Sequence, residues 1–146
     1  MTIELEDRSA WSGGMNAFNG NPLKTESNHG GTVVANTYDG MWLRFDDVDL
    51  GPESLTEVTV EYDAPSQKAP NDVLLEIRRG DEEGELLGSV ALPQTGTGWG
   101  TYLTARAALD VPLSGTETLC LVFTGSTISG QMYLGNLDRV IFAAGE

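Results

Sequence analysis

Short apolar segments that end in turn-forming residues recur along this whole chain, and this pattern limits it to a β-rich fold. Glycine occurs 18 times, mostly between these segments. Residues 19–22, 28–31 and 81–84 contain the asparagine, aspartate, glycine and proline that are typical of turns and loops. No helical periodicity extends over several turns, and residues 8–15 are expected to form at most one helical turn. The sequence therefore predicts an all-β sandwich or barrel.

Several of the expected strands alternate between apolar and polar side chains, as strands with one buried face do. The expected strands are residues 2–6, 32–35, 41–48, 55–62, 72–78, 86–92, 100–107, 116–123 and 137–143. In two of them the side chains expected to face the core are Met41, Leu43, Phe45, Val73, Leu75 and Ile77. The side chains expected on the opposite face are Trp42, Arg44, Leu74, Glu76 and Arg78.

The length and charge of the chain narrow its organisation and its partners. No linker or repeat divides the 146 residues, so residues 1–146 are expected to form a single domain. Acidic residues outnumber basic ones 22 to 8, which gives a formal net charge of −14. This acidity disfavours nucleic acids and anionic lipids, because phosphate binding needs a surface rich in lysine and arginine. No apolar stretch approaches the roughly 20 residues that span a bilayer, so no membrane partner is expected.

The chain has one cysteine and one histidine, so few of its residues could form a transition-metal site or a nucleophilic centre. Cys120 lies inside an apolar segment and is expected to be a buried core thiol. His29 lies between asparagine and glycine and is expected in a loop. Zinc sites and Ser-His or Cys-His catalysis are therefore disfavoured.

Short motifs run through nearly the whole chain and are specific only through their order and spacing. They are residues 3–7, 40–51, 75–78, 84–88, 98–101, 112–115, 121–125 and 136–138. In this order they resemble a family 6 carbohydrate-binding module, with family 35 as close kin. The resemblance implies a β-sandwich jelly roll of two antiparallel sheets. It also implies that the chain is a monomer and is covalently linked to a secreted glycoside hydrolase.

The resemblance also implies a sugar site in the loops at one end of the sandwich. The family holds a sugar there between two aromatic rings, and Trp99 and Asn136 match its tryptophan and its asparagine. The C–H face of a pyranose packs on an indole ring, and an amide both donates to and accepts from hydroxyls. Asn36 stands where the family has its second aromatic residue, and Tyr38 is expected to reach the same space. Glu26 matches a carboxylate that accepts sugar hydroxyls.

A second sugar site is implied on the concave face of one sheet, where some family members bind internal stretches of a glucan. Trp42 and Glu76 match the tryptophan and the carboxylate of that site, and the alternation places both on an outer face. In the alternative interpretation, Arg44 and Arg78 pair with Glu76 and leave an inert surface salt bridge.

A metal site is expected where the first and last strands meet. Glu4 and Glu6, two apart on a strand, project to one side, and two such carboxylates repel unless a cation joins them. The resemblance implies that Asp138 closes this site. Carboxylate oxygens suit Ca²⁺, whose role here is expected to be structural.

These expectations favour an extracellular, non-catalytic module that brings a glycoside hydrolase to a neutral polysaccharide of the xylan or β-glucan type. Two alternatives remain open from the sequence. One is a glycoside hydrolase domain, in which Glu26, Glu76 or other carboxylates form an acid/base pair. The other is a structural or protein-docking sandwich with a degenerate sugar site.

Overall fold

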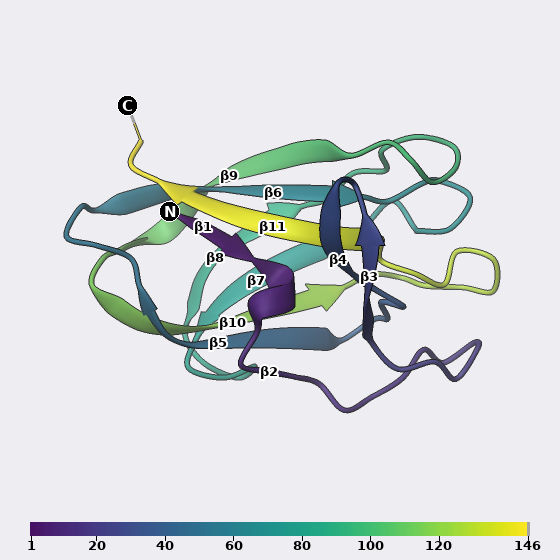
Figure 1. Cartoon of the computed structure of the whole chain (residues 1–146), viewed down its shortest axis with the longest axis horizontal. Coiled ribbons are helices and arrows are strands. Elements are labelled where there is room, and N and C mark those ends of the chain that lie inside the picture. Colours follow the sequence, from purple (N-terminus) through teal and green to yellow (C-terminus); the bar gives the residue numbers. More distant parts are fainter. Residues whose placement is uncertain (146) are drawn as a thin grey trace.

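Alternating apolar side chains along the strands are buried between two antiparallel sheets in a computed structural model that describes residues 1–145. The first sheet has the order β3-β4-β11-β6-β9, and β1 pairs with β11 beside this path (Figure 1). Its strands are β1 (Thr2–Glu4), β3 (Lys24–Asn28), β4 (Gly31–Ala35), β6 (Leu55–Asp63), β9 (Leu103–Leu113) and β11 (Asn136–Ala143).

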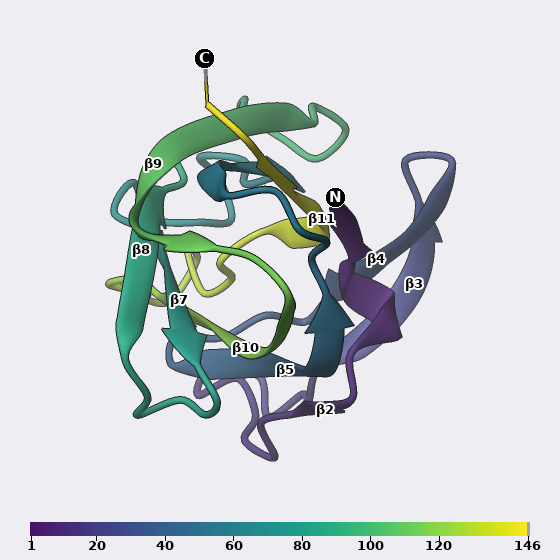
Figure 2. The same ribbon diagram turned by 90° about the vertical axis from the view of Figure 1, so that its left-hand side faces the viewer.

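The second sheet has the order β2-β5-β10-β7-β8. Its strands are β2 (Ala10–Trp11), β5 (Met41–Asp49), β7 (Leu74–Arg79), β8 (Leu86–Ala91) and β10 (Thr116–Thr124). Figure 2 views the sandwich from the left-hand side of Figure 1, with β9 and β11 above the core and β5 and β10 below it. The predicted all-β sandwich of two antiparallel sheets is confirmed.

The core lies between the sheets and is made of the side chains that the alternation assigned to it. Met41, Leu43 and Leu75 are fully buried, and so are the larger rings of Tyr62, Phe123 and Phe142. Each fully buried aliphatic side chain contributes about 1.5–3 kcal/mol to the stability of the fold through the hydrophobic effect. The burial of these core side chains is therefore the main interaction that holds the two sheets together.

Cys120 is buried as predicted, but it belongs to the opposite face of its strand. It pairs in register with Arg44 on β5 and Arg78 on β7, whereas Leu119 and Leu121 on either side enter the core. Burial raises the pKa of the Cys120 thiol to about 12, so it stays protonated near neutral pH.

Several predicted boundaries were wrong where side-chain periodicity is weak. The first strand ends at Glu4, and a 3-10 helix, η1 (Leu5–Asp7), replaces the rest of it. Residues 8–15, where at most one helical turn was expected, contain β2 and no helix. Strand β3 occupies part of a segment that the sequence placed in a loop. Strand β9 begins at Leu103 and not at residue 100, so the loop that carries Trp99 is longer than predicted.

Among residues 1–145 no helix combines the length and the apolar character that crossing a membrane requires.

Candidate functional site

A cavity of about 350 Å³, here called the loop cavity, lies at the end of the sandwich where the loops before β9 and β11 meet β3 and β4 (Figure 1). Its lining residues are Glu26, Asn28, Ala35, Asn36, Trp99, Tyr133 and Asn136. The structure thus brings together four residues that the sequence placed in one sugar site: Trp99, Asn136, Asn36 and Glu26.

Trp99 is an exposed ring on a firmly anchored loop. The ring is 43% exposed, and the flanking Gly100 adopts a φ of +113°, a left-handed conformation that favours glycine. The Gly100 N–H donates to Oδ2 of the buried Asp63 at 2.7 Å, and the Thr95 hydroxyl donates to Oδ1 of the same carboxylate at 2.8 Å. The loop therefore holds a large apolar ring in solvent at a fixed position.

Tyr133 supplies the second aromatic wall, and the sequence analysis missed it. Its ring centroid lies 6.2 Å from that of Trp99, and the two planes are tilted by 59°. The hydroxyl accepts a 2.9 Å hydrogen bond from Asn19 Nδ2, which fixes the ring. The available signal was an aromatic residue three positions before Asn136. Because the rings are tilted, they form an open wedge and not a parallel sandwich.

Tyr38 does not reach the loop cavity, so the prediction that it supplies the second ring was wrong. Asn36 adopts a left-handed φ of +55°, and the buried Thr37 then donates to Gly135 O at 2.8 Å. The chain therefore turns inward after Asn36. Tyr38 is only 8% exposed, and its hydroxyl lies 2.5 Å from Ser12 Oγ.

The polar lining of the loop cavity consists mainly of amides. Asn136 is 7% exposed at the start of β11, while Asn28 and Asn36 lie at the ends of the β3–β4 hairpin. Each amide offers two donors and one acceptor oxygen, which matches the hydroxyl groups of a sugar. Glu26 is the one carboxylate in the lining, and it lies 3.3 Å from the half-exposed Lys24 ammonium.

The outer face of the second sheet carries Trp42 and Glu76. Both residues pair in register with Val122, so β10 lies between them and they share one face. Two strand spacings separate them by about 10 Å. Glu76 Oε2 lies 3.1 Å from Arg78, whose other guanidinium nitrogen donates to Gly84 O at 2.9 Å. Arg44 bonds Asp46 instead, so of the two candidate arginines Arg78 is the one that pairs with Glu76.

The carboxylates of Glu4, Glu6 and Asp138 come within 4.8 Å of one another where β1, η1 and β11 meet. Glu6 projects from the 3-10 helix and not from a continued strand, yet it reaches the same place. Its Oε2 is buried and has no hydrogen-bond partner among residues 1–145. Burial, and next a hydrogen bond with Glu61, raise the pKa of Asp138 to about 6. Arg139 pairs with Glu4 and with Asp138 at 3.5 Å each, so the feature that fits a hard cation such as Ca²⁺ is the buried Glu6 oxygen without a partner.

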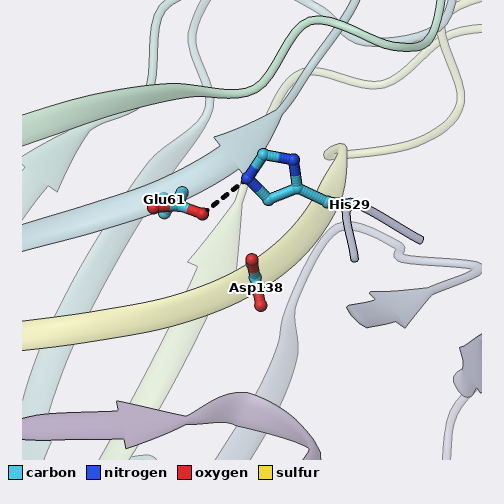
Figure 3. Close-up of side chains that lie close together, drawn as sticks. All are labelled: His29, Glu61 and Asp138. Carbon is cyan, nitrogen blue, oxygen red and sulfur yellow. Dashed lines mark hydrogen bonds and ion pairs between the residues drawn. The ribbon is translucent and has the colours of Figure 1, made fainter. Parts of the chain in front are cut away.

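His29 ties the β3–β4 hairpin to neighbouring strands beside this carboxylate cluster (Figure 3). Its Nε2 lies 2.8 Å from Glu61 Oε1, and its ring stacks on Tyr102 with centroids 4.0 Å apart. His29, Glu61 and Asp138 all offer polar atoms within 4.8 Å of one another. The same hairpin carries Glu26 into the loop cavity, so these contacts hold that wall in place.

A β-sandwich whose loops enclose an exposed indole, a tilted tyrosine and several amides has the features of a carbohydrate-binding domain. The model of the family described as carbohydrate binding module (family 6) matches residues 13–144. The chain belongs to this family.

Solved structures share the fold over almost the whole chain. A family 6 module of Clostridium stercorarium, in complex with cellobiose, is 23% identical with a TM-score of 0.76, covering 99% of this chain and 94% of its own. A β-1,3-glucan-binding module of the same family from Bacillus halodurans is 27% identical with a TM-score of 0.76, covering 99% and 96%. A family 43 arabinoxylan arabinofuranohydrolase of Bacillus subtilis is 20% identical with a TM-score of 0.72; the match covers 99% of this chain and 27% of the enzyme.

Proposed function

We propose that this chain binds one neutral polysaccharide chain in the loop cavity without cleaving it. The observation that carries the proposal is the exposed Trp99 ring, held by an anchored loop 6.2 Å from Tyr133 in a cavity lined by amides. The apolar face of a sugar ring packs on the indole, and Asn136, Asn36 and Glu26 bind its hydroxyls.

A β-glucan or a xylan is the ligand class that this site fits. The Bacillus halodurans module, which binds β-1,3-glucan, supports a β-glucan. The formal net charge of −14 and the carboxylate of Glu26 repel uronic acids, which favours uncharged sugars.

Among residues 1–145, those that line the loop cavity do not include the pair of carboxyl groups that sugar hydrolysis needs. Glycosidases place two carboxyl groups about 5–10 Å apart across the bond that is cleaved. Of the carboxylates in the described part of the chain, Glu26 alone lines the loop cavity, and Glu76 lies on the other sheet. The protonated Cys120 thiol is buried away from this cavity and does not serve as a nucleophile.

The same proposal assigns the chain to a larger secreted enzyme, which it holds near its polysaccharide and so raises the local substrate concentration. The Bacillus subtilis enzyme supports this arrangement, because the match occupies about a quarter of its chain. The start of β1 at Thr2 and the end of β11 at Ala143 lie toward the left of Figure 1, whereas the loops before β9 and β11 lie toward the right, so a domain linked beyond either strand would leave the site open.

Two further sites belong to this proposal. Ca²⁺ held by Glu4, Glu6 and Asp138 joins β1 and η1 to β11, which is supported by the buried Glu6 oxygen that has no hydrogen-bond partner among the described residues. Trp42 and Glu76 form a weaker sugar-binding surface on the second sheet, which is supported by their shared face.

Affinity gels containing laminarin, xylan or hydroxyethyl-cellulose test the proposed function. The wild-type chain is expected to be retarded in at least one gel, and Trp99→Ala is expected to migrate freely. Leu103→Ala is the matched control, because Leu103 is 46% exposed on the first sheet outside the cavity lining. Retention of Trp99→Ala equal to that of the wild type, or release of reducing sugar by the isolated chain, would contradict the proposal.

A further inference from the structure

The loop cavity adjoins two more cavities at the same end of the molecule. The middle cavity has a volume of about 170 Å³ and is bordered by Met15, Asn16, Ala17, Phe18, Tyr38, Asp39, Thr127 and Met132. The edge cavity has a volume of about 310 Å³ and is bordered by Asp39, Asp72, Leu74, Thr124, Gly125 and Ser126.

The loop cavity and the middle cavity lie on two sides of the same short segments. Met132 lines the middle cavity, and Tyr133, the next residue, lines the loop cavity. Phe18 lines the middle cavity, and the next residue, Asn19, donates to the Tyr133 hydroxyl at 2.9 Å. Because consecutive Cα atoms are about 3.8 Å apart, only these short segments separate the two cavities.

The middle and edge cavities share a wall. Asp39 lines both, and the consecutive residues Ser126 and Thr127 line one each. The edge cavity in turn opens on the outer face of the second sheet. Leu74 and Thr124 are register partners on β7 and β10, and the next pair on that face is Glu76 and Val122. Two residues along a strand correspond to about 6.6 Å.

We propose that these surfaces form one continuous track that binds a single polysaccharide chain from Trp99, past Phe18, to Trp42. This inference rests on the proposed function, and it adds a sugar subsite at the middle cavity that joins the loop cavity to the sheet face. The occupant is the next part of the same uncharged chain.

Phe18 is the aromatic platform of this middle subsite. It is 46% exposed, and its N–H donates to Asn16 Oδ1 at 2.9 Å. Asn16 is 1% exposed, and its Nδ2 donates to Thr37 O at 3.1 Å and to Met132 O at 2.8 Å. An exposed phenyl ring on a loop held by a buried amide resembles the presentation of Trp99. Such a ring has a stacking face that folding of the chain leaves unused.

Asp39 and Asp72 supply hydroxyl acceptors beyond Phe18. Asp39 Oδ1 accepts the Gly125 N–H at 3.0 Å, and Asp72 Oδ1 accepts the Ser126 N–H at 2.9 Å. These bonds fix both carboxylates, and each carboxylate has acceptor capacity beyond one hydrogen bond. Like Glu26 and Glu76 at the two ends, they favour a chain that carries hydroxyls and no anionic groups.

Titration calorimetry with laminari-oligosaccharides from the disaccharide to the octasaccharide tests the track, with cello- and xylo-oligosaccharides measured in parallel. The wild-type affinity is expected to rise by about tenfold between the disaccharide and the hexasaccharide, with one hexasaccharide bound per protein. Phe18→Ala is expected to remove most of that rise and to leave disaccharide binding unchanged. Asp39→Asn, which keeps the acceptor for Gly125, is expected to lower hexasaccharide affinity by about threefold.

Leu103→Ala is the control for removal of an equally exposed apolar side chain, and it is expected to match the wild type at every length. The track would be overturned if Phe18→Ala and Asp39→Asn bound the hexasaccharide with the affinity of the wild type. It would also be overturned if two hexasaccharides bound to each wild-type protein. If Trp99→Ala still abolishes disaccharide binding in that case, the proposed function stands and only the track fails. If the wild type binds no member of the three series, both fail.

Discussion

Trp99 and Trp42 each lie near a glutamate, yet the loop cavity and the outer face of the second sheet differ in how free these groups are. Trp99 is 43% exposed on a loop, whereas Trp42 is half-buried within β5. Glu26 lies 3.3 Å from Lys24, whose side chain is 52% exposed and can move away. Glu76 pairs with Arg78, which is only 23% exposed and is also bonded to Gly84 O.

The comparison teaches that residue type alone does not rank two candidate sites. A flexible, solvent-exposed ion pair contributes little and yields to a ligand, whereas a more buried pair costs more to separate. Three amides also line the loop cavity, whereas the sheet face carries an arginine-glutamate pair across β10 from its tryptophan. We therefore expect the loop cavity to bind a sugar first and the sheet face to contribute only with longer chains.

Trp99→Ala tests the stronger side of this comparison and has the largest expected effect. Removing a central aromatic contact costs about 3 kcal/mol of binding free energy, or roughly 150-fold in Kd. Calorimetry with a laminari-, cello- or xylo-trisaccharide measures it, and the melting temperature is expected to stay near that of the wild type because the ring is exposed. A loss below threefold would place the principal site elsewhere.

Removal of Ca²⁺ has the next largest expected effect. If the ion is present at about 100 times its Kd, a chelator lowers the free energy of unfolding by about 2.7 kcal/mol. Asp138 lies two residues from Asn136 on β11, so chelation is expected to weaken the loop cavity more than the sheet face. Differential scanning calorimetry with chelator and with added Ca²⁺ measures the effect.

The calcium effect also has a predicted pH dependence. The pKa of Asp138 is raised to about 6, so this carboxyl must lose a proton before it can bind a cation near or below that pH. Stabilisation by Ca²⁺ is therefore expected to be larger at pH 7 than at pH 5. Glu6→Gln is the matched variant, and it is expected to reduce the stabilisation by Ca²⁺ at both pH values. An identical melting curve with and without Ca²⁺ would contradict the proposed metal site.

Tyr133→Ala sharpens the description of the loop cavity itself. Loss of the second ring is expected to weaken trisaccharide binding by about 1 kcal/mol, or roughly fivefold, because the ring is tilted and offers only part of its face. Tyr133→Phe keeps the ring and loses the bond from Asn19, so it separates stacking from positioning. Tyr38→Phe, which loses only the hydroxyl contact with Ser12 and keeps the buried ring, is expected to leave trisaccharide binding unchanged.

Trp42→Ala tests the weaker side and has the smallest expected effect. Trisaccharide binding is expected to change by less than about 0.5 kcal/mol, or roughly twofold, because Glu76 remains paired with Arg78. Trisaccharide calorimetry on Trp42→Ala and Trp99→Ala side by side gives the ranking directly. A larger loss for Trp42→Ala than for Trp99→Ala would reverse the comparison.

The fold class, the core faces and most of the loop cavity could be predicted from the sequence. Alternation of apolar residues predicted that Met41, Leu43 and Leu75 are buried, because a strand with one solvent-facing side must alternate. The family motifs placed Trp99 and Asn136 at one end, and the structure brings both into one cavity.

Only the tertiary structure decided which second ring faces Trp99 and how the carboxylates meet. The left-handed turn at Asn36 directs Tyr38 inward, while Tyr133 arrives from a loop almost 100 residues later in the chain. Such pairs depend on the path of loops in space, and local side-chain patterns carry no information about that path. For the same reason, the proximity of Phe18 to the loop cavity, through the bond from Asn19 to Tyr133, depends on the folded loops and not on the local sequence.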